Sequence, residues 1–128
     1  MKFGQVMVAV LLVTLVSVTV AQAHKGAGFG YSGEGATLQI EPADLPAHLL
    51  PDFNLMKKHC TKCHTQERIV RHLQDNISRG TDYEPILKAL IMKKLRMSSG
   101  LSKADGKTIM DFLLTLYQLE MLEHTKLK

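Results

Sequence analysis

The chain has 128 residues, of which 45% are hydrophobic and 5% aromatic, and its formal net charge is +4. This length allows one small domain once any targeting segment is removed. The charge is too small, and the aromatic side chains are too few, to indicate a nucleic-acid-binding surface. No Ser/His/Asp set, paired carboxylates or glycine-rich phosphate loop indicates an enzyme, so we expect none.

Residues 1–23 have the pattern of a secretory signal peptide. Lys2 supplies the positive start, residues 6–20 form an apolar run, and Ala21-Gln22-Ala23 matches a small-residue cleavage site. The run is short for a membrane-spanning helix, although an uncleaved anchor is the alternative. We therefore expect a periplasmic protein that begins at His24 and has no membrane span after cleavage.

A glycine- and proline-rich segment follows at residues 24–45. Five glycines fall within ten residues, and no hydrophobic periodicity accompanies them. We expect a flexible arm here, in which a short strand at residues 36–40 is optional. The folded domain is expected at residues 46–128.

Four helices and no convincing strand are expected in this domain, so its fold class is all-α. The first helix begins near Pro51 and runs into the cysteines, and the second ends with Gly80 as its cap. Capping boxes at residues 81–84 and 102–105 begin the third and fourth helices, with a break at residues 98–100. The residues expected to face the core at helical spacing are Ile69, Val70, Leu73, Ile77, Ile86, Leu87, Leu90, Ile91, Leu95, Ile109, Phe112, Leu113, Leu116 and Tyr117.

The most informative motif is Cys60-Thr61-Lys62-Cys63-His64. Two cysteines three residues apart, followed by histidine, are typical of covalent c-type haem attachment. Residues i and i+3 of a helical turn project from nearly the same side, so both thiols can add to the vinyl groups along one porphyrin edge. His64 is then carried over the haem plane, where its imidazole can ligate iron. We predict one haem c, with thioethers at Cys60 and Cys63 and His64 as the proximal iron ligand.

Three other kinds of site use a similar pair of cysteines. A thioredoxin-like redox pair usually follows a strand, and no strand pattern precedes Cys60. A zinc site needs further ligands, and the spacings of His59 and His72 fit no common zinc module. A structural disulfide would leave His64 without a role. Haem attachment explains all three residues of the motif.

Over residues 52–119 the chain resembles class I-type monohaem cytochromes c. The resemblance lies in a helix ending in the cysteine motif, a methionine loop further along and a capped C-terminal helix. It implies a small helical domain around one haem, in which the first and last helices cross through Met56, Phe112 and Leu116. The residues before 46 are not covered.

Some positions depart from the family's pattern. Ser98 stands where a proline often follows the ligand methionine, and Pro85 is the nearest proline after His64, farther along than usual. Tyr83 is the obvious candidate for the aromatic residue that lies near a haem propionate in the family.

The resemblance implies a methionine as the sixth iron ligand. Met97 is the first choice because it begins the break before the last helix, and Met92 is the alternative. A histidine or an open sixth position is the third possibility. Sulfur ligation favours ferrous iron and raises the reduction potential relative to two histidines. Either methionine could instead be an ordinary core residue.

These features predict an electron carrier that works with redox partner proteins, because a saturated iron offers no site to a substrate. Basic side chains near the motif and the methionine loop could steer an acidic docking face, or could be ordinary solvated helix surface. They are Lys57, Lys58, Lys62, Lys93, Lys94 and Arg96. The alternative functions are a haem-bearing subunit of a larger oxidoreductase and a gas-binding sensor with an open sixth position.

Overall fold

The fold is described from a computed structural model, which describes residues 25–26, 29–97, 100–126 and 128. The predicted signal peptide at residues 1–23, together with Ser98 and Ser99, lies outside these residues, so the signal peptide stays a prediction. Within the described residues, no helix combines the length and the apolar character needed to cross a membrane.

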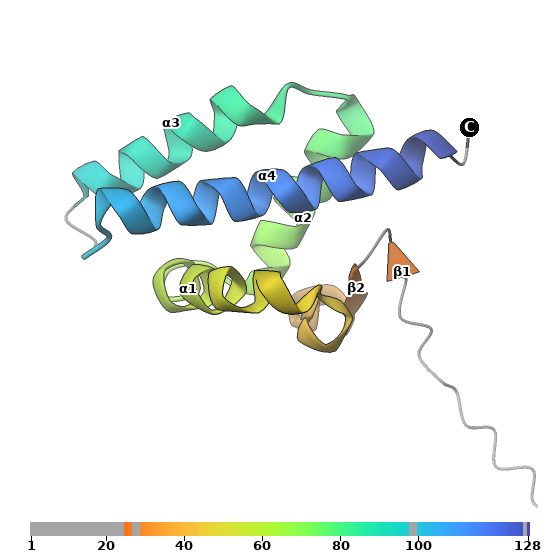
Figure 1. The fold of residues 1–128 in the computed structure, drawn as a ribbon, viewed down its shortest axis with the longest axis horizontal. Coiled ribbons are helices and arrows are strands. Elements are labelled where there is room, and N and C mark those ends of the chain that lie inside the picture. Colours follow the sequence, from red (N-terminus) through yellow and green to blue (C-terminus); the bar gives the residue numbers. More distant parts are fainter. Residues whose placement is uncertain (1–24, 27–28, 98–99, 127) are drawn as a thin grey trace, which may run out of the picture.

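Four α-helices make up most of the described chain, as expected (Figure 1). They are α1 (Leu50–Cys60), α2 (Gln66–Arg79), α3 (Tyr83–Arg96) and α4 (Lys103–Lys126). In Figure 1, α3 lies alongside α4, and α1 lies on the other side of α4. The C-terminal ends of α1 and α3 and the N-terminal end of α4 are all toward the left of that view.

The core forms where α1 meets α4. The rings of Phe53 and Phe112 are tilted against each other with their centroids 6.2 Å apart, and each side chain is 1% exposed. Met56 and Leu116 are fully buried in the same cluster. The first and last helices therefore meet as expected; Phe112 packs on Phe53, which was not predicted, and Met56 and Leu116 are buried in the same cluster.

The predicted Gly80 cap of α2 and the predicted start of α4 are confirmed, and Thr65, for which no cap was predicted, precedes α2. The Thr65 hydroxyl accepts a hydrogen bond from the Arg68 amide at 3.4 Å, and Gly80 ends α2 in the left-handed conformation at φ 61°. At α4, the Ser102 hydroxyl accepts from the Asp105 amide at 3.0 Å. These short-range signals work because each partner is only a few residues away.

Two expectations for α3 are wrong. The residue preceding its first turn is Asp82, without a capping side-chain bond, and not Thr81. The Thr81 carbonyl is instead the acceptor for the Tyr117 hydroxyl at 2.5 Å, so a contact with α4 sets this helix start. Leu90 is 46% exposed and does not face the core, because α3 buries Leu87 and Ile91 along a narrower stripe.

Two predictions for the glycine-rich segment are wrong: it is not simply a flexible arm, and the fold does contain strands. It forms the small antiparallel sheet of β1 (Lys25–Gly26), β2 (Phe29–Ser32) and β3 (Gln39–Glu41). Tyr31 pairs with Ile40, and both side chains are buried in the core. The Tyr31 hydroxyl donates to the Glu120 carboxylate of α4. Residues 29–45 are thus built into the domain.

Short 3₁₀ turns connect these strands to α1. They lie at Gly35–Thr37, Pro42–Asp44 and Ala47–Leu49. The optional strand at residues 36–40 is therefore shifted to β3, because a turn occupies its first half. Leu45 and Leu49 are buried in this approach and join it to the core.

Gly33→Ala is expected to destabilise the protein more than Gly35→Ala. Both glycines have a positive φ, at 78° and 55°, so each alanine incurs a left-handed cost of about 1–2 kcal/mol. A Cβ on Gly33 would also collide with the Thr37 carbonyl, whereas nothing lies within 4 Å of one on Gly35. Urea unfolding measures both free energies. Equal losses, or no loss in either variant, would contradict the folded turn.

Candidate haem-attachment site

The cysteine motif lies at the end of α1 and in the turn that leads to α2. The His64 amide donates to the Cys60 carbonyl at 3.1 Å, which is a helical bond across the motif. The Thr61 amide and hydroxyl both donate to the Lys57 carbonyl, at 3.2 and 2.6 Å. The backbone therefore continues in a helical turn, the conformation that brings side chains i and i+3 to one side.

The two thiols of the motif are free but differ in environment. Cys60 is buried in the core cluster at 8% exposure, whereas Cys63 is exposed. Burial raises the pKa of the Cys60 thiol, Lys94 opposes that rise, and Cys63 adds to it.

His64 is exposed and lines a surface depression of about 450 Å³. Its ring makes no hydrogen bond or ion pair with any other residue that the structure describes. The lining residues come from the turn before β3 with the first residue of β3, from the cysteine turn and from the start of α2: Ala36, Thr37, Leu38, Gln39, Thr61, His64, Thr65 and Gln66. The segment that was expected to be an arm thus supplies one wall of the site.

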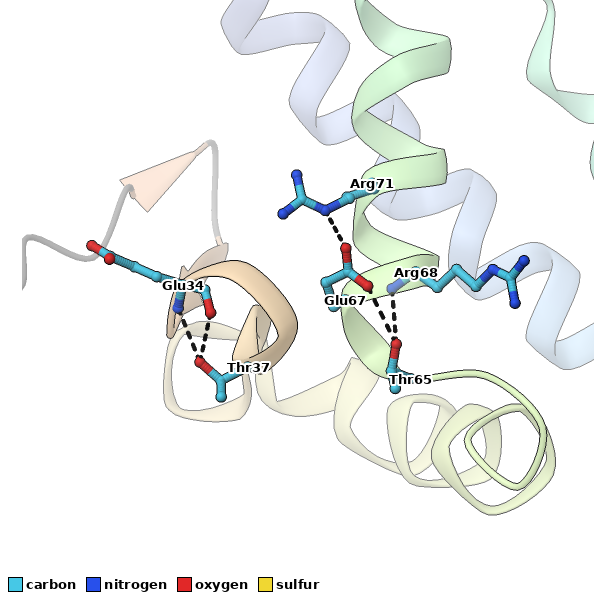
Figure 2. Close-up of polar contacts among 6 residues, drawn as sticks. All are labelled: Glu34, Thr37, Thr65, Glu67, Arg68 and Arg71. Carbon is cyan, nitrogen blue, oxygen red and sulfur yellow. Dashed lines mark hydrogen bonds and ion pairs between the residues drawn. The ribbon is translucent and has the colours of Figure 1, made fainter.

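Both walls of the depression are held by local polar contacts (Figure 2). On one wall, the Thr37 hydroxyl accepts from the Glu34 amide at 3.1 Å and donates to the Glu34 carbonyl at 2.8 Å. On the other, Thr65 caps α2, and Glu67 forms an ion pair with Arg71 one turn later. These contacts hold the backbone of both walls of the depression that His64 lines.

His59 is a residue whose position the sequence did not indicate. It is 7% exposed, and neither ring nitrogen has a hydrogen-bond partner among the described residues. Its Nε2 lies 3.7 Å from Asp105 Oδ2, close enough for an ion pair if the ring is protonated but beyond hydrogen-bond length. The His59 carbonyl accepts from the Lys94 Nζ at 2.5 Å. Separations of 35 and 46 residues leave no local pattern that would reveal these contacts.

The two candidate methionine ligands lie in different surroundings. Met97 immediately follows α3 and is 70% exposed, and its amide donates to the Lys93 and Lys94 carbonyls. Met92 is 45% exposed and lines a mostly apolar groove of about 330 Å³ between α3 and α4. Neither is a buried core residue. Through Lys94, the Met97 end of α3 is joined to the residue beside Cys60.

The remaining histidines and Tyr83 lie elsewhere in the fold. His48 and His124 are exposed in other parts of the fold. His72 Nδ1 lies 3.0 Å from the Tyr83 hydroxyl, and the Tyr83 ring stacks on Tyr117 at 4.8 Å. Burial raises the pKa of Tyr83, which is 2% exposed. Tyr83 is a buried aromatic residue already engaged with His72, and its place beside a propionate stays a prediction.

Four of the six basic residues singled out in the sequence are exposed and form no ion pair with a described carboxylate. They are Lys58, Lys62, Lys93 and Arg96. Lys57 is partly covered and lies over the Phe53 ring, 5.1 Å from its centroid. Lys94 differs from the others because it reaches inward to His59.

The donor groups fit a c-type haem in kind. Two free thiols and an imidazole share one helical turn, and the imidazole opens onto a surface depression. Among the described residues, no three His, Cys, Asp or Glu side chains converge as a metal-binding group. Cys60 and Cys63 would hold the macrocycle, and His64 would present its imidazole to the iron.

Comparison with known proteins adds no relative. No protein-family model matches the chain, and no significant match is found among curated proteins or among solved structures.

Proposed function

We propose that this protein is an exported monohaem c-type cytochrome that transfers single electrons between redox partners. The observation that carries the proposal is the helical turn with Cys60, Cys63 and His64, in which the imidazole makes no hydrogen bond or ion pair with a described residue and borders a depression. When bound, haem c supplies one electron-carrying centre, whose iron alternates between the ferric and ferrous states. The predicted signal peptide supports a periplasmic location.

The protein's own residues have three tasks in this proposal. Cys60 and Cys63 hold the cofactor covalently, and His64 supplies the proximal nitrogen ligand. Met97 supplies a thioether as the sixth ligand, which leaves no open position for a substrate. Four exposed basic side chains without a described ion pair favour a partner with an acidic face. They are Lys58, Lys62, Lys93 and Arg96.

The direct test is the visible spectrum of the purified mature protein. Extraction with pyridine should yield the haemochrome of a porphyrin with two thioether bonds, in a ratio of one haem per chain. A colourless product from cells that assemble other c-type cytochromes would refute the proposal. Free thiols, or a Cys60–Cys63 disulfide, would then be found by mass spectrometry.

Met97→Ala is expected to abolish the near-infrared band that arises from sulfur bound to ferric haem iron. The reason is that alanine removes the thioether from the end of α3, while α3 itself is kept by Leu87 and Ile91. Met92→Ala is the matched control, since it removes a thioether five residues earlier, from within α3. A band that persists in Met97→Ala and disappears in Met92→Ala would exchange the two assignments.

Rapid binding of carbon monoxide by the reduced protein distinguishes the gas-sensor alternative. The wild type should bind slowly at neutral pH, and Met97→Ala should bind rapidly. Rapid binding by the wild type would indicate that the sixth position is open.

A further inference from the structure

Both ends of the methionine loop touch one buried residue beside the attachment turn. Lys94 lies three residues before Met97, at the end of α3, and its ammonium is 2.5 Å from the His59 carbonyl. Asp105 lies in the first turn of α4, and its carboxylate is 3.7 Å from His59 Nε2. His59 itself is the neighbour of Cys60. We call these three residues the His59 junction.

The Lys94 contact has a clear electrostatic basis. The last carbonyls of an α-helix lack helical partners and carry the negative end of its dipole. In α1, the Lys57 and Cys60 carbonyls are satisfied by Thr61 and His64, respectively. The His59 carbonyl is satisfied by the ammonium of Lys94, across 35 residues of sequence. A cation is thus bound at the end of the helix that carries the motif.

The His59 side chain is nearly closed to water, whereas the Asp105 side chain is 40% exposed. His59 is 7% exposed, and both ring nitrogens lack a hydrogen bond. A buried ring nitrogen without a partner is costly, and the Asp105 carboxylate is the acidic group nearest to it in ion-pair geometry. The His59 ring, near the end of α1, therefore faces Asp105 in the first turn of α4.

We infer that the His59 junction positions Met97, by tying the end of α3 and the start of α4 to the cysteine turn. This role rests on the proposed function. The Met97 amide is bonded to the Lys93 and Lys94 carbonyls, so the helix end that carries Met97 moves with Lys94. His59 and Lys94 are positioning residues, and their effect on the iron is through the methionine.

The test is the competition between imidazole and the methionine sulfur in the ferric holoprotein. An added ligand binds in proportion to the fraction of protein whose sixth position is open. Lys94→Met removes the ammonium and keeps the apolar stem, and is expected to tighten imidazole binding about tenfold, equivalent to about 1.4 kcal/mol. Lys94→Arg should restore most of the wild-type value, because guanidinium also donates to a carbonyl.

Lys88→Met is the matched control, since Lys88 is an exposed lysine on the same helix. It should leave imidazole affinity within about twofold of the wild type, a difference well below the tenfold step. Asp105→Asn is a second variant at the other end of the loop; it keeps the backbone cap from Ser102 and should tighten imidazole binding in the same direction.

The outcomes separate this role from the function on which it depends. A chain without haem, or a holoprotein without the near-infrared sulfur band, would overturn both. Normal haem and a normal band, with Lys94→Met equal to Lys88→Met in imidazole affinity, would overturn the positioning role alone. If Lys94→Met does not fold, Asp105→Asn decides the question. An imidazole affinity of Asp105→Asn equal to that of the wild type would then overturn the positioning role. A tenfold effect rescued by Lys94→Arg would support it.

Discussion

Replacing Cys63 with alanine is expected to remove most of the holoprotein and to leave at most one thioether bond in what remains. The exposed thiol at this position is the accessible half of the pair, whereas Cys60 is buried. Without Cys63, the cofactor would be held through Cys60 alone, and His64 would no longer be fixed relative to the ring by the neighbouring thioether. The pyridine haemochrome spectrum measures this directly, because its maximum depends on how many vinyl groups are saturated.

Lys62→Ala is the control for this experiment. Lys62 lies between the two cysteines, is exposed and forms no ion pair with a described residue, so its loss should leave haem content unchanged. Normal assembly of Cys63→Ala, with a haemochrome identical to that of the wild type, would contradict attachment through this turn. Equal loss in both variants would indicate that the variants are degraded for reasons other than attachment.

The helices could be predicted because their signals are local. The Ser102 cap and the left-handed Gly80 each involve a partner within a few residues, so the sequence pattern and the structure agree. At the start of α3 the same reasoning failed. There the Thr81 carbonyl accepts from Tyr117, 36 residues away, and the helix begins after Asp82 without a side-chain cap.

The sheet could not be predicted because its strands carry little pattern. β2 contains Gly30, and β3 has only three residues, too few for alternation to be recognised. Their pairing places Tyr31 opposite Ile40, and both side chains then find cover on the helices. The bond from Tyr31 to Glu120 spans 89 residues. Such contacts depend on how the helices pack, so no local sequence pattern predicts them.

The candidate site likewise has a part that the sequence predicts and a part that depends on long-range contacts. Cys60, Cys63 and His64 are contiguous, so their shared turn follows directly from the motif. The wall at residues 36–39 and the contact of Lys94 with His59 depend on tertiary packing. The sequence grouped Lys94 with solvent-facing cations, and nothing in its local surroundings distinguishes it from Lys93.

Phe112→Ala is expected to lower the free energy of unfolding by about 3–5 kcal/mol, the range for deleting a buried phenylalanine. Phe112 is 1% exposed and lies against Phe53, so alanine would leave a cavity where α4 meets α1. A domain of this kind is stable by only about 5–15 kcal/mol in all, so a loss of this size is a large part of its stability. Urea unfolding followed by far-ultraviolet circular dichroism measures the change.

Leu122→Ala is the matched control on the same helix. Leu122 is 58% exposed, so its truncation should change the free energy of unfolding by less than about 0.5 kcal/mol. The comparison also bears on the site, because α1 carries the attachment turn at its end and α4 begins at the methionine loop. If the α1–α4 contact holds these two segments in register, Phe112→Ala should weaken the sulfur-to-iron band at denaturant concentrations that leave it intact in Leu122→Ala. Equal stability of the two variants would mean that α1 and α4 do not meet through Phe112.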